Sequence, residues 1–159
     1  TKWFGRPGLG FVDMHTVLAY AMGPSGATVH RRDGYQMALA LTPPTPRRGL
    51  MLIDPSWVVK ADYQAIPRHM AHIHRKWNVG ILILWYPILK GGSHGPMLKA
   101  LEEAFPDGLR HEVRFPAARD GHRMEGSGLF IVNAPYGLAE ELATLTSRFA
   151  RLSKPDGKA

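Results

Sequence analysis

The sequence predicts an α/β domain whose sheet is mostly parallel and is finished by an antiparallel hairpin. Short apolar runs alternate with segments of helical period, which is the pattern of buried strands connected by helices. Near the carboxyl end this alternation stops, because a polar loop at 116–128 joins two strand-like segments with no helical period between them. A chain of 159 residues is long enough for one such domain with one hydrophobic core.

The first part of the chain is predicted to hold two short strands and two helices. Residues 1–10 are glycine-rich but follow no strand, so we expect a flexible lead-in rather than a cofactor-binding loop. The apolar segment 11–15 reads as a strand, followed by a helical stretch to residue 22. Residues 27–32 alternate as a strand does, and a short helix is expected at 35–41.

The middle of the chain is predicted to form a strand, a helix and a second strand. Apolar runs at 49–53 and 79–85 have the length and composition of buried strands, the second ending at Tyr86 and Pro87. Residues 62–77 carry a helical period. Pro67 is expected to interrupt this helix, or to lie in the first turn of a helix that starts late, because proline removes a backbone hydrogen bond.

The carboxyl-terminal part is predicted to contain a helix, the hairpin and a last helix. Pro96 suits the first turn of a helix over 96–105. The hairpin strands are expected at 109–115 and 129–132, and the last helix at 138–152. Residues 153–159 read as a disordered tail. No internal repeat is found, so residues 11–152 are predicted to form a single domain.

The composition favours a polyanionic partner. Twenty Lys and Arg residues outnumber thirteen Asp and Glu residues, which gives a net charge of +7. Such a charge attracts nucleic acid through neutralisation of phosphates and release of counterions. The chain has no cysteine, which excludes disulfides and thiolate metal sites. We expect no metal, no membrane-spanning segment and no signal peptide, and therefore a cytoplasmic protein.

A short polar motif follows the apolar run at 49–53. Asp54, Pro55, Ser56 and Trp57 place a carboxylate, a rigid turn and an aromatic ring where a parallel strand ends. Ligands of open α/β sheets bind beyond the carboxyl ends of the strands, and this combination suits a flat substrate that forms hydrogen bonds, such as a nucleobase. The alternative is structural, because Asp-Pro commonly opens a turn and a tryptophan can cap a core.

An ordered set of motifs resembles the family of the ribosomal RNA large-subunit methyltransferase J. In chain order these motifs are Arg47-Arg48-Gly49-Leu50, Leu52-Ile53-Asp54-Pro55, Lys60-Ala61-Asp62-Tyr63, Leu84-Trp85-Tyr86-Pro87, Gly126-Ser127-Gly128 and Asn133-Ala134-Pro135-Tyr136-Gly137. The resemblance covers about residues 26–150. It implies a class I, Rossmann-like methyltransferase that uses S-adenosylmethionine to methylate N6 of an adenine in 23S rRNA.

By this resemblance the Asp54–Trp57 motif binds the target base. The amino nitrogen of adenine is a poor nucleophile, because its lone pair is delocalised into the ring. The Asp54 carboxylate and the Pro55 carbonyl would each accept one N–H bond and aim the lone pair at the methyl group, while Trp57 would stack on the flipped base. Positioning and charge complementarity would then supply the rate, without a metal or a covalent intermediate.

The resemblance also implies residues for the cofactor, and the basic residues of the chain are separate candidates for RNA contact. Asp13 would bind the ribose hydroxyls of the cofactor, although a helix N-cap is an equal alternative for it. Asp33 would accept a bond from the cofactor adenine, with Gly34 and Tyr35 beside it. RNA phosphates would be contacted by a set of cations, for which a solvated basic surface is the alternative: Arg47, Arg48, Arg68, Arg75 and Lys76. The nearby His69, His72 and His74 do not share one helical face, so they are not expected to bind a metal.

The chain also departs from the family pattern. Ser56 replaces a second proline, Trp57 a tyrosine and Val58 a glutamate, and the acceptor geometry depends mainly on Asp54 and Pro55. The family's first half is missing, with its lysine- and histidine-containing motif, its first strand and glycine-rich cofactor loop, and a helical insertion. We therefore expect exposed apolar surface unless the chain self-associates or pairs with a chain that supplies the missing half.

Three functions remain open on the sequence alone. The first is the rRNA methyltransferase. The second is a truncated, non-catalytic remnant that binds nucleic acid or a partner chain. The third keeps the enzyme class but changes the substrate to DNA, including a role with external DNA, or to a protein glutamine. Trp85, Tyr86 and Pro87 are expected either to line the base pocket or to belong to the core. A second group is expected to be solvated surface: Arg110, His111, Glu112 and Arg114.

Overall fold

The structure is a computed structural model that describes residues 20–22, 28–57, 60–115 and 121–152. The chain divides into two compact units, Thr1–Ala40 and Leu41–Ala159, and each is considered by itself. The predicted lead-in, the strand at 11–15 with Asp13, and the tail lie outside the described residues.

The described part of the first unit holds most of one helix. Helix α2 spans Gly34–Leu41, which confirms the predicted short helix. Asp33 stands at its start, where one carboxylate oxygen accepts a hydrogen bond from the Gln36 backbone N–H (2.9 Å). The strand predicted at 27–32 is wrong for its described residues, because 28–32 form no strand. Alternation alone does not make a strand, since a ladder needs a neighbouring strand.

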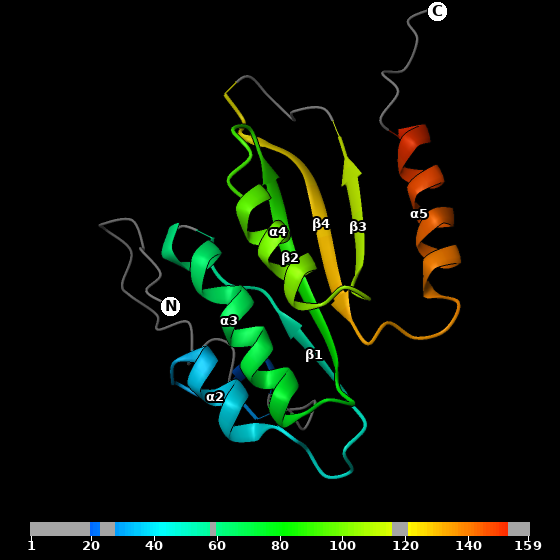
Figure 1. Cartoon of the computed structure of the whole chain (residues 1–159). Helices are drawn as coiled ribbons and strands as arrows, with labels where there is room; N and C mark the ends of the chain where they lie inside the picture. The colour runs from blue at the N-terminus through cyan, green and yellow to red at the C-terminus, as the bar shows by residue number, and fades with distance from the viewer. Residues whose placement is uncertain (1–19, 23–27, 58–59, 116–120, 153–159) are drawn as a thin grey trace, which may run out of the picture. The chain divides into compact units, whose positions relative to one another are not determined.

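The second unit is built on a mixed four-stranded sheet. The strands are β1 (Leu50–Ile53), β2 (Ile81–Leu89), β3 (Leu109–Arg114) and β4 (Met124–Val132). Their order is β1-β2-β4-β3, with β1 and β2 parallel and the other pairs antiparallel (Figure 1). The α/β class and the closing hairpin are confirmed. The described sheet is mixed rather than mostly parallel, because β4 inserts between β2 and β3.

Helices cover both faces of this sheet. Helices α3 (Lys60–Lys76) and α4 (Gly95–Ala104) pack on each other over one face (Figure 1). Helix α5 (Leu138–Leu152) contacts β3, and a hydrogen bond links Thr146 Oγ1 to His111 Nδ1 (3.4 Å). His111 points to the face opposite its neighbour Glu112, and the register places Glu112 on the same face as the buried Tyr86. Helix α5 therefore lies on the face opposite α4.

The core lies between the sheet and the α3–α4 layer. Alternate side chains of β2 are at most 1% exposed, namely Leu82, Leu84, Tyr86 and Ile88. Side chains of the neighbouring elements are buried as well, namely Ile66, Met70 and Ile73 of α3, Leu98 and Leu101 of α4 and Phe130 of β4. Each fully buried large apolar side chain contributes roughly 1.5–3 kcal/mol, so this layer holds the second unit together.

Pro67 does not interrupt its helix. Helix α3 runs without a break from Lys60 to Lys76 with Pro67 inside it, so the predicted interruption is wrong. The buried side chains of α3 recur at the spacing of one helical face: Tyr63, Ile66, Met70 and Ile73. Burial of this face outweighs the backbone hydrogen bond that Pro67 cannot donate.

Strands β2 and β4 are longer than predicted, because they support each other. Tyr86 and Pro87 continue β2 to Leu89, and Met124 to Gly128, expected in a loop, pair with them. Gly128 faces Tyr86 directly, and a Cβ at this position would collide with the Tyr86 ring. Two of the family motifs, at 84–87 and 126–128, are thus the two sides of one close packing contact.

Strand β1 is an edge strand within the described part of the chain, and one of its faces is exposed. Leu50 and Leu52 are 57% and 63% exposed, and the register places them beside the half-buried Ile81 and Ile83. The expectation of exposed apolar surface is confirmed here.

Candidate functional site

The Asp54–Trp57 motif lies directly beyond the carboxyl end of β1. Strand β1 ends at Ile53, paired with Leu84 of the parallel strand β2. Asp54 is exposed, whereas Pro55, Ser56 and Trp57 are half-buried. The motif therefore offers a solvent-accessible carboxylate on a partly fixed turn, at the edge of the sheet where α/β folds bind ligands.

Trp57 is held in an unusual backbone conformation. Its φ angle is 58°, in the left-handed region that bulky residues rarely adopt. Its ring packs on the Tyr63 ring of α3, with centroids 4.9 Å apart and planes tilted by 52°. Its indole Nε1 is buried and has no hydrogen-bond partner among the described residues. Strain and an unsatisfied donor on one residue are typical of binding sites.

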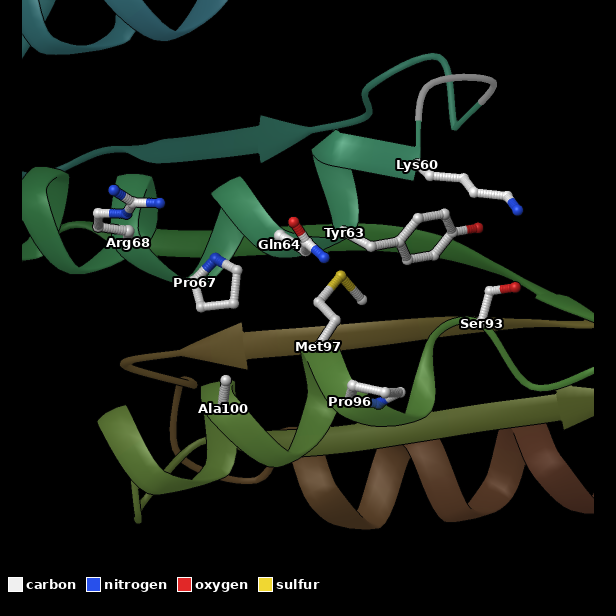
Figure 2. A pocket seen from close by; sticks show the side chains of 9 residues that line it. All are labelled: Lys60, Tyr63, Gln64, Pro67, Arg68, Ser93, Pro96, Met97 and Ala100. Carbon is white, nitrogen blue, oxygen red and sulfur yellow. The ribbon is translucent and has the colours of Figure 1, made fainter.

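Tyr63 connects the motif to a groove between α3 and α4. The side chain is 8% exposed, burial raises the pKa of its phenol, and its hydroxyl lacks a hydrogen-bond partner within the described part of the chain. Tyr63 lines a groove of about 520 Å³ with eight further residues: Lys60, Gln64, Pro67, Arg68, Ser93, Pro96, Met97 and Ala100 (Figure 2). Sequence reasoning selected Arg68 alone from this set. A signal for Lys60 and Gln64 was available, because residues 60, 64 and 68 recur every four positions on one face of a helix.

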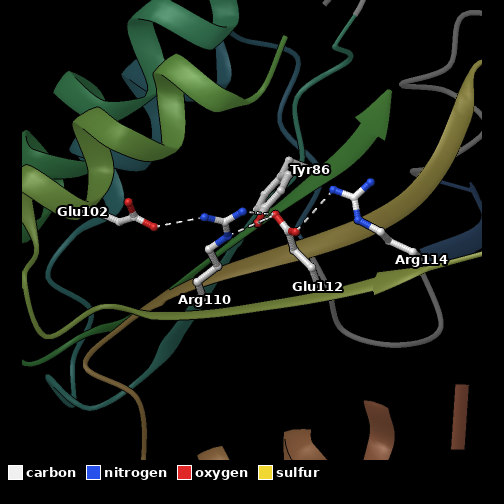
Figure 3. Close-up of polar contacts among 5 residues, drawn as sticks. All are labelled: Tyr86, Glu102, Arg110, Glu112 and Arg114. Carbon is white, nitrogen blue, oxygen red and sulfur yellow. Dashed lines mark hydrogen bonds and ion pairs between the residues drawn. The ribbon is translucent and has the colours of Figure 1, made fainter. Parts of the chain in front are cut away.

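Polar side chains of β3 and α4 form a second cluster, which holds the Tyr86 hydroxyl in the core (Figure 3). The Tyr86 hydroxyl donates to Glu112 Oε1 (3.0 Å), and the Arg110 guanidinium bridges Glu112 (2.8 Å) and Glu102 (3.3 Å). Arg114 Nη2 lies 3.9 Å from Glu112 Oε2. Tyr86 is 0% exposed, so it belongs to the core and does not line a base pocket. The expectation of a merely solvated surface is wrong for Glu112, which is half-buried.

The neighbours of Trp85 and Tyr86 complete this packing. Trp85 Nε1 donates to Ser127 Oγ (2.6 Å), on the face opposite Tyr86. The His94 ring stacks on Tyr86 with centroids 5.9 Å apart, and His94 is 7% exposed. The Trp-Tyr and Gly-Ser-Gly matches are therefore explained by structure rather than by substrate contact.

Burial and charge set the titration of this cluster. Burial raises the pKa of Tyr86, and the Glu112 carboxylate raises it further. Burial alone would raise the pKa of Glu112, but the hydrogen bonds from Arg110 and Tyr86 outweigh burial and lower it. Burial lowers the pKa of His94, which Glu112 opposes and the two guanidinium groups reinforce.

The five cations predicted to bind RNA fall into two places. Arg47 and Arg48 precede β1, so the length of this strand, about 13 Å at roughly 3.3 Å per residue, separates them from Asp54. Helix α3 returns from the carboxyl end of β1 to the amino end of β2, so Arg75 and Lys76 in its last turn lie at the same end as Arg47. Arg47 Nη2 reaches Asn78 Oδ1 (3.5 Å), and the Trp77 indole donates to the Arg47 carbonyl (2.6 Å). Arg68 instead lines the groove.

The residues predicted to hold the cofactor lie around the start of α2. Asp33 is exposed, and the carboxylate oxygen that does not cap α2 can accept a further hydrogen bond. Gly34 is exposed and Tyr35 is half-buried beside it. A carboxylate with an open oxygen fits a bond from an adenine amino group. Asp13 lies outside the described residues.

The histidines of α3 do not form a metal site. His74 packs edge-on against Phe105, with centroids 5.3 Å apart, and His72 is exposed. Across the described residues, no group of three or more His, Cys, Asp or Glu side chains could hold a metal ion. None of the helices described is long and apolar enough to cross a membrane.

Several known proteins are similar to this chain. A family model described as ribosomal RNA large subunit methyltransferase D, RlmJ, matches residues 14–158. The ribosomal RNA large subunit methyltransferase J of Escherichia coli K12 is 34% identical over 74% of this chain and 42% of its own length. The protein of the same name from Haemophilus influenzae is 28% identical over 82% of this chain and 47% of its own length.

A solved structure agrees with these matches. A Legionella pneumophila protein assigned to the family DUF519 superposes with a TM-score of 0.71 at 29% identity, over 79% of this chain and 46% of that protein. The chain thus spans less than half the length of the relatives that it matches. On the extent of the family match, this chain belongs to the RlmJ family of ribosomal RNA large-subunit methyltransferases.

Proposed function

We propose that this chain carries the target-base half of an S-adenosylmethionine-dependent methyltransferase that modifies N6 of an adenine in 23S rRNA. The observation that carries the proposal is the Asp54–Trp57 motif, with an exposed carboxylate at the end of β1 and a strained, half-buried aromatic ring next to it. Family membership supports rRNA as the substrate.

The residues of the motif have separate tasks in this mechanism. Asp54 and the carbonyl of Pro55 accept the two N–H groups of adenine N6, which localises the nitrogen lone pair and orients it. Trp57 offers a ring for the flipped base, and its contact with Tyr63 fixes that ring in place. After transfer the nitrogen carries an extra proton, and the exposed Asp54 carboxylate is placed to stabilise that charge until water removes the proton.

The cofactor would supply a methyl group on a positively charged sulfur. We propose that Asp33 accepts a hydrogen bond from the adenine of the cofactor, with Gly34 and Tyr35 next to it and Asp13 at the ribose. The open carboxylate oxygen of Asp33 supports this assignment. The five cations, Arg47, Arg48, Arg68, Arg75 and Lys76, would contact phosphates, as an excess positive charge of +7 favours.

A second function is favoured by one observation, the exposed apolar face of β1, on which Leu50 and Leu52 are 57% and 63% exposed. A basic chain with such a surface can bind RNA or a partner chain without transferring methyl groups. The third function, with DNA or a protein glutamine as substrate, rests on the motif type alone.

Calorimetric titration of the chain with S-adenosylmethionine separates the first two functions. Binding followed by methylated adenine in an rRNA fragment, identified by mass spectrometry, would support the enzyme. An absence of heat at millimolar cofactor would contradict catalysis by this chain alone and favour the binding function.

Substitution of Asp54 tests the role of the motif. We expect Asp54→Ala to lower methyl transfer by about 10²- to 10³-fold, since it removes a preorganised polar contact to the reacting group. Cofactor affinity should change by less than roughly 2-fold, because Asp54 is assigned to the base. Asp54→Asn retains an acceptor oxygen and should lose less activity. A large loss of cofactor binding in Asp54→Ala would contradict the assignment.

A further inference from the structure

The groove between α3 and α4 has the size and position of a second binding site. Its volume of about 520 Å³ lies within the range of small-molecule pockets, roughly 300–1,000 Å³. It lies on the α3–α4 layer and shares Tyr63 with the Asp54–Trp57 motif, because the Tyr63 ring contacts Trp57. A ligand that extends from the motif can therefore enter the groove next.

A positively charged side chain lies at each end of this groove. Lys60 and Arg68 stand eight residues apart on α3, about 12 Å along the helix axis at roughly 1.5 Å per residue. Figure 2 shows Lys60 near Ser93 at one end and Arg68 at the other, with Gln64 between them. No carboxylate lines the groove, and no ion pair within the described part of the chain involves Lys60 or Arg68. An anionic ligand would meet two cations for which no described carboxylate competes.

The floor of the groove is apolar. Pro67 of α3 faces Pro96, Met97 and Ala100 of α4 across it (Figure 2). Proline rings and a polarizable thioether form a surface on which a base or a ribose can pack. Sites that bind single-stranded nucleic acid combine a basic groove with a packing surface for bases, and here prolines and Met97 stand where such sites commonly have aromatic rings.

One buried group in the groove lacks a protein partner. Tyr63 is 8% exposed and lines the groove, and its hydroxyl has no hydrogen-bond partner among the described residues. In Figure 2 the hydroxyl points toward the end that holds Lys60 and Ser93. Such a buried hydroxyl is usually satisfied, so a polar atom of a ligand is expected to reach it.

We propose that this groove holds the nucleotide next to the target adenine in the RNA strand. Its base or ribose packs over Pro67 and Met97, and its flanking phosphates contact Lys60 and Arg68. The proposal rests on the proposed function, which places the target adenine at Asp54–Trp57. It adds a site that sets how the RNA strand is held beside the reacting base.

A charge placed inside the groove tests the proposal. The full chain is titrated, without S-adenosylmethionine, into a fluorescein-labelled single-stranded oligoadenylate, and anisotropy gives the affinity. Ala100→Glu puts a carboxylate on the groove wall and should weaken binding by at least about 10-fold. Ala143→Glu makes the same charge change on exposed α5, on the other face of the sheet, and should have an effect below roughly 2-fold. Unchanged helical circular dichroism establishes that both variants fold.

The salt dependence of binding identifies the phosphate contacts. Each phosphate contact in a single strand contributes about 0.7 to the slope of log affinity against log salt. Lys60→Ala and Arg68→Ala should each lower the slope by about that amount, and the double variant by about 1.4. Lys99→Ala removes an exposed cation of α4 that does not line the groove and should leave the slope unchanged.

The outcomes separate this proposal from the proposed function. Equal effects of Ala100→Glu and Ala143→Glu, or no binding of the oligoadenylate by the unaltered chain, would overturn the groove site. Neither result depends on methyl transfer. A chain that binds through the groove but never methylates RNA would support the site and contradict catalysis.

Discussion

Trp57 shows why a motif and its geometry carry different information. A left-handed conformation costs a bulky residue about 1–3 kcal/mol, and it persists only where the surroundings fix it. Here the surroundings are Tyr63, whose ring lies 4.9 Å from the indole. The sequence predicted the place of Trp57 at the end of a strand. It could not predict the contact, because that depends on how α3 returns over the sheet.

His94 makes stability depend on pH, since its folded pKa is lowered by burial. Between the lowered pKa and the ordinary value near 6.5, the unfolded chain binds more protons than the folded chain. The contribution of His94 is therefore complete above about pH 6.5 and is lost as pH falls through the folded pKa. We expect the midpoint temperature of thermal unfolding to decrease as the pH is lowered from 7.5 to 5.5.

A matched pair of variants isolates this effect. The charged groups that face His94 are Glu112, Arg110 and Arg114, and its ring lies on Tyr86. His94→Gln should flatten the pH dependence measured by differential scanning calorimetry. His72→Gln, at an exposed position of α3, should keep it. If both variants follow the unaltered chain, His94 is not the titrating group.

At the scale of elements, α3 contains an internal destabilising residue. Pro67 removes one backbone hydrogen bond and crowds the preceding turn, yet it lines the groove. Pro67→Ala should raise the free energy of unfolding by about 1–3 kcal/mol, measured by urea denaturation. Pro96→Ala in the first turn of α4 should be nearly neutral, because no helical hydrogen bond is missing there. No gain for Pro67→Ala would mean that the helix has already relaxed around the proline.

The limits of some elements follow from the local sequence, whereas the limits of others depend on the strand that pairs with them. Helices α2, α4 and α5 were predicted to within one residue or so, because amphipathic period and first-turn prolines are local. Strand β2 was predicted too short, since Pro87 looks like a strand end until β4 pairs with it. The strand predicted at 27–32 is wrong for the opposite reason, because its described residues pair with no neighbouring strand. Strand limits depend on neighbours that the local sequence does not contain.

At the scale of the whole molecule, the exposed face of β1 is predicted to mediate association. Leu52 is 63% exposed on an edge strand, so Leu52→Lys should change the free energy of unfolding by no more than about 0.5 kcal/mol. It should also lower the concentration-dependent self-association seen by sedimentation velocity, because a charge on an edge opposes pairing. Val79→Lys adds the same charge at a position 50% exposed outside the strand. Equal effects of the two lysines would assign the change to net charge rather than to the face of β1.

The candidate site was predicted in part for the same physical reasons. The position of Asp54 follows from an apolar run that ends in Asp-Pro, which is local information. The division of the predicted RNA-binding cations was not predictable, because Arg68, in the middle of α3, lines the groove, whereas Arg75 lies in the last turn of the same helix. The core position of Tyr86 depends on Gly128, which lies more than forty positions away in the chain.

The shared ring of Tyr63 has a thermodynamic consequence. Tyr63 contacts Trp57 on one side and lines the groove on the other, so a ligand that moves the ring at one place changes the energy of binding at the other. Linkage requires this coupling to be reciprocal. By whatever factor a nucleotide in the groove alters the affinity of the motif for adenine, adenine alters the affinity of the groove by the same factor. One tyrosine would thus make recognition of two neighbouring nucleotides a single cooperative event.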